Sequence, residues 1–351
     1  MSRRLFAKRN QPILSGQGSR QRLHWPSVVL GSLALAAPLA ACGPGFDPSS
    51  TVERARLVGA RLSVASDPRR AAPLPGEEVT AQPWLVQPAD ESLVRATYIV
   101  CLAADIRRGA SMCEGGPLAL VPPSAPSVDL PPVTFTVPAT TPATAQLILV
   151  MVTCDQGATP SLDAATMLVQ CDNPISRSEL ATLNLPLADS VETANRHPDI
   201  GDETYRVQAE GGLIDWPAST APLTRGCVTS GMPVVRVPSD ALPPTAREPY
   251  RIDLTFTTTE DDRDSYTTRT GVMAREALQI SHYVTAGRMS RSFSAVEATA
   301  TSDLPITVRW APPAIETIPT DGMPVRFTWI ARDLRGGFAR ADRELCVTPA
   351  I

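Results

Sequence analysis

The sequence is poor in lysine, histidine and aromatic residues, and its charged residues are unevenly distributed. Lys8 is the only lysine among 32 basic residues, 3 residues are histidine, and 5% are aromatic. The first 41 residues carry six basic side chains and no acidic one, so the remainder has 26 basic against 36 acidic residues and a formal charge of −10. Nucleic-acid phosphates require a basic face, which an acidic body does not offer. We therefore expect no nucleic-acid partner.

No hydrophobic run in the sequence is long enough to span a membrane as a helix. The longest, residues 27–41, has about 15 residues, contains Pro38 and follows a basic segment, whereas a span needs about 20. A short apolar run behind basic residues is typical of the hydrophobic core of a signal peptide. We predict that residues 1–41 are a signal peptide.

The run ends in Leu39-Ala40-Ala41-Cys42, which resembles the lipobox of bacterial lipoproteins. The resemblance implies that Cys42 becomes the first residue of the mature protein and carries acyl chains such as palmitate. Two or more acyl chains give stable anchoring. Gly43 follows the cysteine in place of an aspartate, which by analogy with the family implies the outer membrane, facing either the periplasm or the surface. Residues 2–8 also resemble a twin-arginine export signal, so the export route stays open.

Short strands with alternating apolar residues dominate the rest of the chain. Residues 58–64 alternate, and the pattern recurs at 133–137, 252–256, 306–310 and 325–331, with turn signals such as Asp321-Gly322 between them. This alternation puts one strand face on a core and the other in water. Closely spaced strands of this kind favour antiparallel sandwiches, so the sequence predicts an all-β protein. Residues 275–287 fit either a strand or a helix, and their β-prone composition favours a strand.

Composition predicts two domains after a short tether. We place the tether at 42–53, the first domain at 54–188 and the second at 189–351, with a loop-rich insertion at about 212–246. Pro186 stops the last strand of the first domain, and the polar segment 189–198 follows it.

Two short stretches carry a resemblance to a domain family. Pro75-Gly76-Glu77 and the segment 329–337 resemble Ig-like domains of the polycystic-kidney-disease or cadherin-like kind in bacterial surface lipoproteins. In that pattern an aspartate, here within Trp329–Gly337, closes the penultimate strand, and a glycine pair allows positive φ in the final hairpin. The resemblance implies two tandem Ig-like antiparallel β-sandwiches.

Six cysteines remain after Cys42 is set aside, and an even set in an exported chain indicates disulfides. Sequential pairing is the simplest of the many connectivities that six cysteines allow. It predicts disulfides between neighbours in this series: Cys101 with Cys113, Cys154 with Cys171, and Cys227 with Cys346.

The sequence offers little for catalysis or metal binding. It has no G-x-S-x-G motif and no C-x-x-C motif, and His197 and His282 stand far apart, so we expect no catalytic residues and no cofactor. Asp261, Asp262 and Asp264 follow a predicted strand and are candidate Ca²⁺ ligands, with a solvated hairpin loop as the alternative.

The four tryptophans after residue 41 fall into two groups. Trp310 and Trp329 lie on the apolar phase of their strands and are predicted to be core residues. Trp84 lies on the opposite phase of its strand and Trp216 lies in the insertion, so these two are the candidates for exposed contact with a ligand.

These features lead us to expect a non-enzymatic protein of the cell envelope, anchored to the membrane by lipid and acting as a structural or interaction module. Its partner would be an envelope protein or a glycan. Two alternatives stay open. One is an envelope glycan-binding module that uses Trp84 or Trp216, and the other is an envelope hydrolase with a site near residues 212–246.

Overall fold

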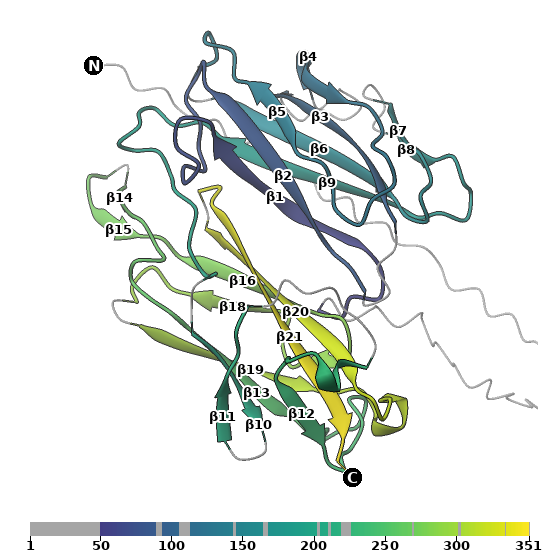
Figure 1. Cartoon of the computed structure of the whole chain (residues 1–351). Coiled ribbons are helices and arrows are strands. Elements are labelled where there is room, and N and C mark those ends of the chain that lie inside the picture. Colours follow the sequence, from purple (N-terminus) through teal and green to yellow (C-terminus); the bar gives the residue numbers. More distant parts are fainter. Residues whose placement is uncertain are drawn as a thin grey trace, which may run out of the picture. The chain divides into compact units, whose positions relative to one another are not determined.

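The computed structural model describes residues 50–88, 93–104, 113–142, 145–163, 168–201, 204–209, 212–218, 226–268, 270–300, 303–333 and 335–350. Within these ranges the chain is all-β, as predicted, and forms several sheets (Figure 1). The predicted signal peptide and Cys42 lie outside the described residues. Among the described residues, no helix has the length and apolar character needed to cross a membrane.

The N-terminal half, residues 50–186, contains two larger sheets and one small one. The first sheet has the order β1 (Arg56–Val64), β2 (Glu78–Val86), β5 (Val133–Thr136), and the second has the order β4 (Cys113–Val121), β3 (Arg95–Ala103), β6 (Gln146–Cys154), β9 (Ser178–Pro186). β7 (Pro160–Asp163) pairs with β8 (Leu168–Cys171). Both larger sheets contribute to one buried apolar cluster, which includes Leu62, Tyr98 and Leu149.

The C-terminal half, residues 205–350, contains two five-stranded sheets. One has the order β11 (Gly212–Asp215), β10 (Tyr205–Ala209), β13 (Ile252–Thr258), β19 (Leu304–Ala311), β17 (Arg288–Met289). The other has the order β12 (Val234–Val237), β21 (Phe338–Pro349), β20 (Met323–Asp333), β16 (Leu278–Val284), β18 (Phe293–Val296). β14 (Ser265–Thr267) pairs with β15 (Met273–Arg275), and two 3-10 helices, η1 (Cys227–Thr229) and η2 (Ile315–Thr317), connect strands.

Aromatic side chains fill the core of the C-terminal half. The Trp310 ring lies edge-on to Phe327 with ring centroids 5.0 Å apart, and Trp329 stacks on Phe327 at 5.8 Å. Edge-on and offset contacts of this kind add stability beyond the burial of the rings. The prediction that Trp310 and Trp329 are core residues is confirmed, since both are buried. The preference for a strand within 275–287 is also confirmed, because β16 covers most of the segment.

The three predicted disulfides are present. Cys101–Cys113 links β3 to β4, Cys154–Cys171 links β6 to β8, and Cys227–Cys346 links η1 to β21. The third closes the longest loop, with a sequence separation of 119. Sequential pairing is therefore confirmed.

Three expectations about the chain need correction. The predicted tether, 42–53, is docked at its end, because Ser50 and Val52 exchange backbone hydrogen bonds with Val284 and both are buried. The predicted loop-rich insertion, 212–246, holds β11 and β12, each of which extends a sheet. The sheets are also not purely antiparallel, because β12 pairs with β21 in parallel.

Candidate functional site at the junction of the two halves

Two cavities lie near the turn between β20 and β21, where the two halves meet. A cavity of about 520 Å³ is lined by Thr193, Asp264, Tyr266 and Arg335, among others. A second, of about 320 Å³, shares Asp264 and is lined by His197 and residues of both halves. Because ligand sites occur preferentially in such clefts between domains, this junction is the candidate functional site.

The junction is apolar at its centre. Val58 and Val86 of the N-terminal half form a buried cluster with Ile330 and Phe338 of the C-terminal half, and Trp84 packs against the cluster. The Trp84 and Phe338 ring centroids lie 5.0 Å apart. Burial of this cluster favours close contact of the halves, at about 25 cal/mol for each Å² of apolar surface removed from water.

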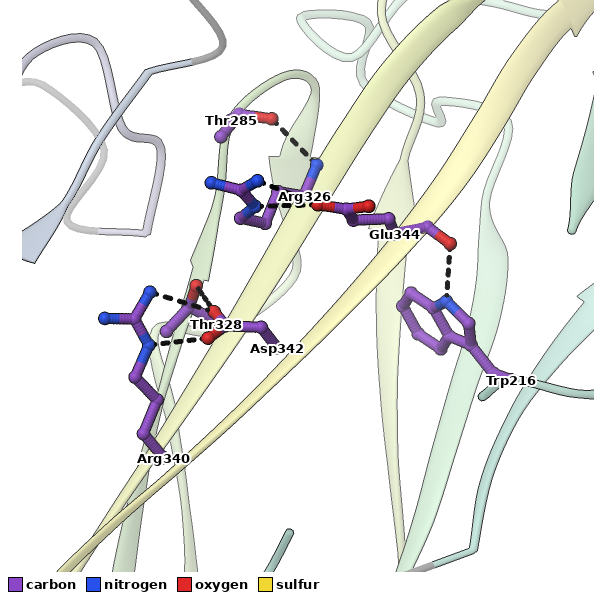
Figure 2. A network of polar contacts seen from close by, with 7 residues as sticks. All are labelled: Trp216, Thr285, Arg326, Thr328, Arg340, Asp342 and Glu344. Carbon is purple, nitrogen blue, oxygen red and sulfur yellow. Dashed lines mark hydrogen bonds and ion pairs between the residues drawn. The ribbon is translucent and has the colours of Figure 1, made fainter. Parts of the chain in front are cut away.

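A polar network borders this apolar centre on the same face of β20 and β21. Figure 2 shows Arg326 and Glu344, which lie opposite each other in register, joined by an ion pair of 2.9 Å. The Glu344 side chain is fully buried, and its main-chain oxygen accepts a 2.9 Å hydrogen bond from Trp216 Nε1. Cross-strand pairs of opposite charge stabilise a sheet, and a buried carboxylate requires such a partner.

The next pair along the hairpin reaches across to the N-terminal half. Asp342 accepts hydrogen bonds from Thr328 Oγ1 and from the Arg340 guanidinium (Figure 2). Arg340 Nη1 also donates a 3.0 Å hydrogen bond to the main-chain oxygen of Leu85 in β2. Arg332, on the same face, donates to the main-chain oxygen of Val58 in β1. The face therefore holds the halves together with directional bonds as well as apolar contact.

Asp333 closes the β20–β21 hairpin, as the resemblance to Ig-like domains implied for an aspartate in this stretch. Its Oδ1 accepts 2.7 Å hydrogen bonds from the backbone N–H groups of Arg335 and Gly337, and its Oδ2 accepts one from Asn195 Nδ2. Burial raises the pKa of the Asp333 carboxyl, and these hydrogen bonds oppose the rise. The hairpin turn is thus tied to the segment that connects the two halves.

Only one of the two glycines of this hairpin has the expected positive φ. Gly336 has φ +99°, the left-handed region that glycine adopts readily, so positive φ is confirmed there. Gly337 has no positive φ. A Cβ atom at Gly337 would lie 1.9 Å from Asp333 Oδ2 and 2.7 Å from the main-chain oxygen of Arg196, so space and not φ requires glycine at that position.

His197 also bridges the halves. Its Nδ1 accepts a 3.1 Å hydrogen bond from the backbone N–H of Phe338, and its Nε2 lies at hydrogen-bond distance from the main-chain oxygen of Leu62. This geometry assigns the proton to Nε2, because Nδ1 acts as an acceptor. Burial lowers the pKa of His197 to about 4, so the ring is neutral at pH 7 and serves as a structural link.

Glu276 is another buried acid near the junction. Its Oε1 accepts a 2.9 Å hydrogen bond from Arg335 Nη1. The Arg335 guanidinium also lies 4.5 Å from the centroid of the Tyr266 ring. Burial, together with the nearby Asp333 and Asp264 carboxyls, raises the pKa of Glu276 to about 8 and outweighs the effect of Arg335. Perturbed acids beside a cavity are a recognised feature of functional sites.

The structure corrects the expectations for the tryptophans. Trp216 is 2% exposed and packs edge-on against Phe327 and Trp329, so it is a core residue and does not face solvent. Trp84 is half-buried, because its ring covers the apolar centre of the junction. Trp216 directly follows β11, which pairs with β10, and the prediction of a loop-rich insertion does not include this strand.

The candidate calcium ligands do not converge. Asp261 is exposed, Asp262 accepts from the backbone N–H of Thr259, and Asp264 Oδ2 accepts from the backbone N–H of Arg196 at 3.2 Å. Arg263 between them is buried and donates to the main-chain oxygens of Glu297 and Ala300. In the part of the chain that the structure describes, no group of three or more His, Cys, Asp or Glu side chains is arranged to hold a metal ion.

Sequence reasoning missed Asn195 and Glu276. Asn195 lies in the polar segment 189–198, and nothing in its neighbours distinguishes it. Glu276 did carry a signal, because it precedes the buried residues Leu278, Ile280 and Val284 in the same alternating phase. An acidic residue on the buried phase of a strand indicates a paired or hydrogen-bonded side chain.

No known protein-family model matches the chain, and no curated protein is significantly similar to it. The geometry of the junction and the N-terminal motif are therefore the grounds for assigning a function.

Proposed function

We propose that this chain is a lipid-anchored protein of the bacterial outer membrane, in which two tandem Ig-like β-sandwiches form a non-enzymatic structural or interaction module. The pairing of the other cysteines supports a lipid anchor at Cys42. The six cysteines that the structure describes are joined to one another in three disulfides, so none of them is left to pair with Cys42. A thiol left over at the end of an apolar run, within a lipobox-like sequence, is placed for acylation.

The disulfides also support an exported protein. Disulfides persist in oxidising compartments such as the bacterial periplasm and the cell surface, and they are rare in the cytosol. Each half has a buried apolar cluster to which both of its larger sheets contribute, which is the arrangement that a sandwich requires. We assign one Ig-like sandwich to each half on this basis.

The contacts at the junction support a module whose two sandwiches pack against each other. Flexible linkers leave domains free to move, whereas here His197 and Asn195 of the connecting segment bond to β1 and to the β20–β21 hairpin. Contacts of this kind limit how far the two sandwiches can move relative to each other. Such preorganisation lowers the entropic cost of binding a partner.

Metabolic labelling with radioactive palmitate tests the anchor. We expect label on the wild-type protein and none on Cys42→Ala. The matched control replaces Cys101 and Cys113 together by serine, which removes two sulfur atoms elsewhere and should leave the labelling intact. Labelling of Cys42→Ala at the wild-type level would overturn the anchor, as would an unmodified Cys42 in mass spectrometry of the natively expressed protein.

A further inference from the structure

An arginine-lined pocket lies away from the junction, on the outer face of the β13–β19–β17 sheet. The cavity has a volume of about 350 Å³. Four of its ten lining residues are arginine: Arg247, Arg251, Arg288 and Arg309. Pro244, Ala246, Pro249, Met289, Ser290 and Ala311 complete the lining.

The strand register places three of these arginines side by side. Arg288 of β17 lies opposite Ala311 of β19. On the other side of β19, Ile252 of β13 lies opposite Trp310, so the preceding residue, Arg251, lies next to Ala311. Arg309 lies two residues before Ala311 and therefore on the same face. The Cβ atoms of directly opposite residues lie within about 5.5 Å of each other. The small side chain of Ala311 thus forms a floor between guanidinium groups from three neighbouring strands.

The charge of the pocket is largely uncompensated. Arg309 contacts Asp253 at 3.4 Å, with both side chains about half exposed. Among the described residues, Arg247, Arg251 and Arg288 make no ion pair, and the neighbouring Glu248 does not line the pocket. Guanidinium groups repel one another, and an anion between them relieves that repulsion. An excess of three positive charges in one cavity is unusual for a body with a formal charge of −10.

The chemistry of the lining selects a doubly charged oxyanion. Guanidinium is planar and forms paired hydrogen bonds with phosphate or carboxylate oxygens. Three uncompensated guanidinium groups match a phosphate dianion better than a carboxylate with one charge. The Ser290 hydroxyl accepts from the backbone N–H of Arg309 at 3.2 Å, which leaves its own proton free to donate to a phosphate oxygen.

Residues 242–250, which line one side of the pocket, are held in shape by hydrogen bonds within the segment. Ala246 N donates to the main-chain oxygen of Pro243 at 2.9 Å, and Tyr250 N donates to that of Leu242 at 3.2 Å. Pro244 and Pro249 fix φ in the same segment. A cavity of this volume falls at the small end of the range for ligand pockets, which leaves room beside the phosphate for a group about the size of a sugar ring.

We propose that this pocket binds a phosphate monoester, held by Arg251 and Arg288 on either side of Ala311 and by Arg247 from above. The phosphate comes either from a free sugar phosphate or from the headgroup of a lipid. This site is separate from the junction, and its occupancy does not depend on acylation of Cys42.

Isothermal titration calorimetry and vesicle sedimentation test the proposal, with the full chain carrying Cys42→Ala so that no acyl anchor contributes. The soluble probes are inorganic phosphate and glucose 6-phosphate, with glucose as the uncharged control. The vesicles contain phosphatidylcholine with or without phosphatidic acid. Arg251→Gln and Arg288→Gln, singly and together, test the pocket. Arg177→Gln removes the same charge at an exposed position of the N-terminal half.

We expect glucose 6-phosphate or phosphatidic acid to bind and glucose not to bind. Each pocket variant should lose about tenfold or more in affinity, because one charge-assisted hydrogen bond is removed. Arg177→Gln should bind as the wild type does. Binding of the sugar phosphate alone identifies a free ligand, and binding of phosphatidic acid vesicles alone identifies a headgroup. Absence of binding in both arms overturns the proposal, and so does an equal loss in Arg177→Gln and the pocket variants.

Discussion

The side-chain amide of Asn195 donates a 2.9 Å hydrogen bond to Asp333 Oδ2, and both residues are buried. Asn195 belongs to the segment that connects the halves, whereas Asp333 ends β20 and holds the hairpin turn through its other oxygen. The main-chain oxygen of Asn195 also accepts a 2.8 Å hydrogen bond from the backbone N–H of Ala71 in the N-terminal half. One asparagine therefore contacts both halves.

Replacement of Asn195 by alanine should lower the free energy of unfolding by about 1–3 kcal/mol, because a buried oxygen of Asp333 loses its partner. Urea denaturation followed by tryptophan fluorescence measures the change. Asn184→Ala, at an exposed position of β9, is the matched control and should change stability by less than about 0.5 kcal/mol. Equal midpoints for the two variants would contradict a role for Asn195 in joining the halves.

A glycine in β1 should prove essential to the close approach of the halves. Gly59 has φ +146° and lies at a bulge, and a Cβ atom there would be 2.4 Å from Cζ of Phe338. Gly59→Ala therefore combines backbone strain with a steric clash, and we expect a loss of stability well above the roughly 1–2 kcal/mol that strain alone costs.

A matched glycine separates the clash from the strain. Gly212 has φ +128° and open space around the position of a Cβ atom, so Gly212→Ala reports strain only. The double variant Gly59→Ala, Phe338→Ala removes the ring that the new methyl group meets. We expect its stability to exceed the sum of the single effects by about 0.5–3 kcal/mol, a coupling typical of residues in contact. Simple additivity in the denaturation midpoints would argue against direct contact between Gly59 and Phe338.

The strands were largely predictable because their signal is local. A period of two is set by the pleat of each strand, so residues such as Val325, Phe327 and Trp329 identify β20 without any knowledge of its neighbours. The pairing of the cysteines followed in the same way from order along the chain. The parallel partner of β21 was not predictable, because the alternation in Val234–Val237 is the same for either strand direction.

The junction was not predictable, because its parts come from distant places in the sequence. Trp84 and Phe338 are in contact although they lie 254 positions apart in the sequence, and neither residue has a local feature that points to the other. The close approach of Phe338 to Gly59, and of the main-chain oxygen of Arg196 to Gly337, also joins segments that are distant in the sequence. The expected exposure of Trp84 failed for this reason: its strand phase faces away from the core of its own half and is then covered by the other half.

Loss of the disulfide with the longest loop should destabilise the protein most. In the loop-entropy account, a cross-link over 119 residues stabilises by about 5 kcal/mol and one over 12 residues by about 3 kcal/mol. We expect the pair Cys227→Ala, Cys346→Ala to lower the urea midpoint more than the pair Cys101→Ala, Cys113→Ala. The reverse order would show that local packing, and not loop length, sets the contribution of each disulfide.

Glu276 should make the stability of the protein fall as pH rises. The pKa of Glu276 is about 8 in the folded protein and 4.5 for an ordinary glutamate, as in the unfolded chain, so between these pH values the folded state binds more protons than the unfolded state. Stability then decreases with rising pH across this window and levels off above it. The raised pKa of Asp333 acts in the same direction.

Melting temperatures from pH 5 to pH 8.5 measure how steeply stability falls with pH. Glu276→Gln should reduce this slope, because glutamine keeps the shape of the side chain and removes the titrating group. Glu316→Gln, at an exposed position of η2, should leave the slope unchanged. If wild type and Glu276→Gln melt with the same pH dependence, the buried carboxyl does not titrate in this window.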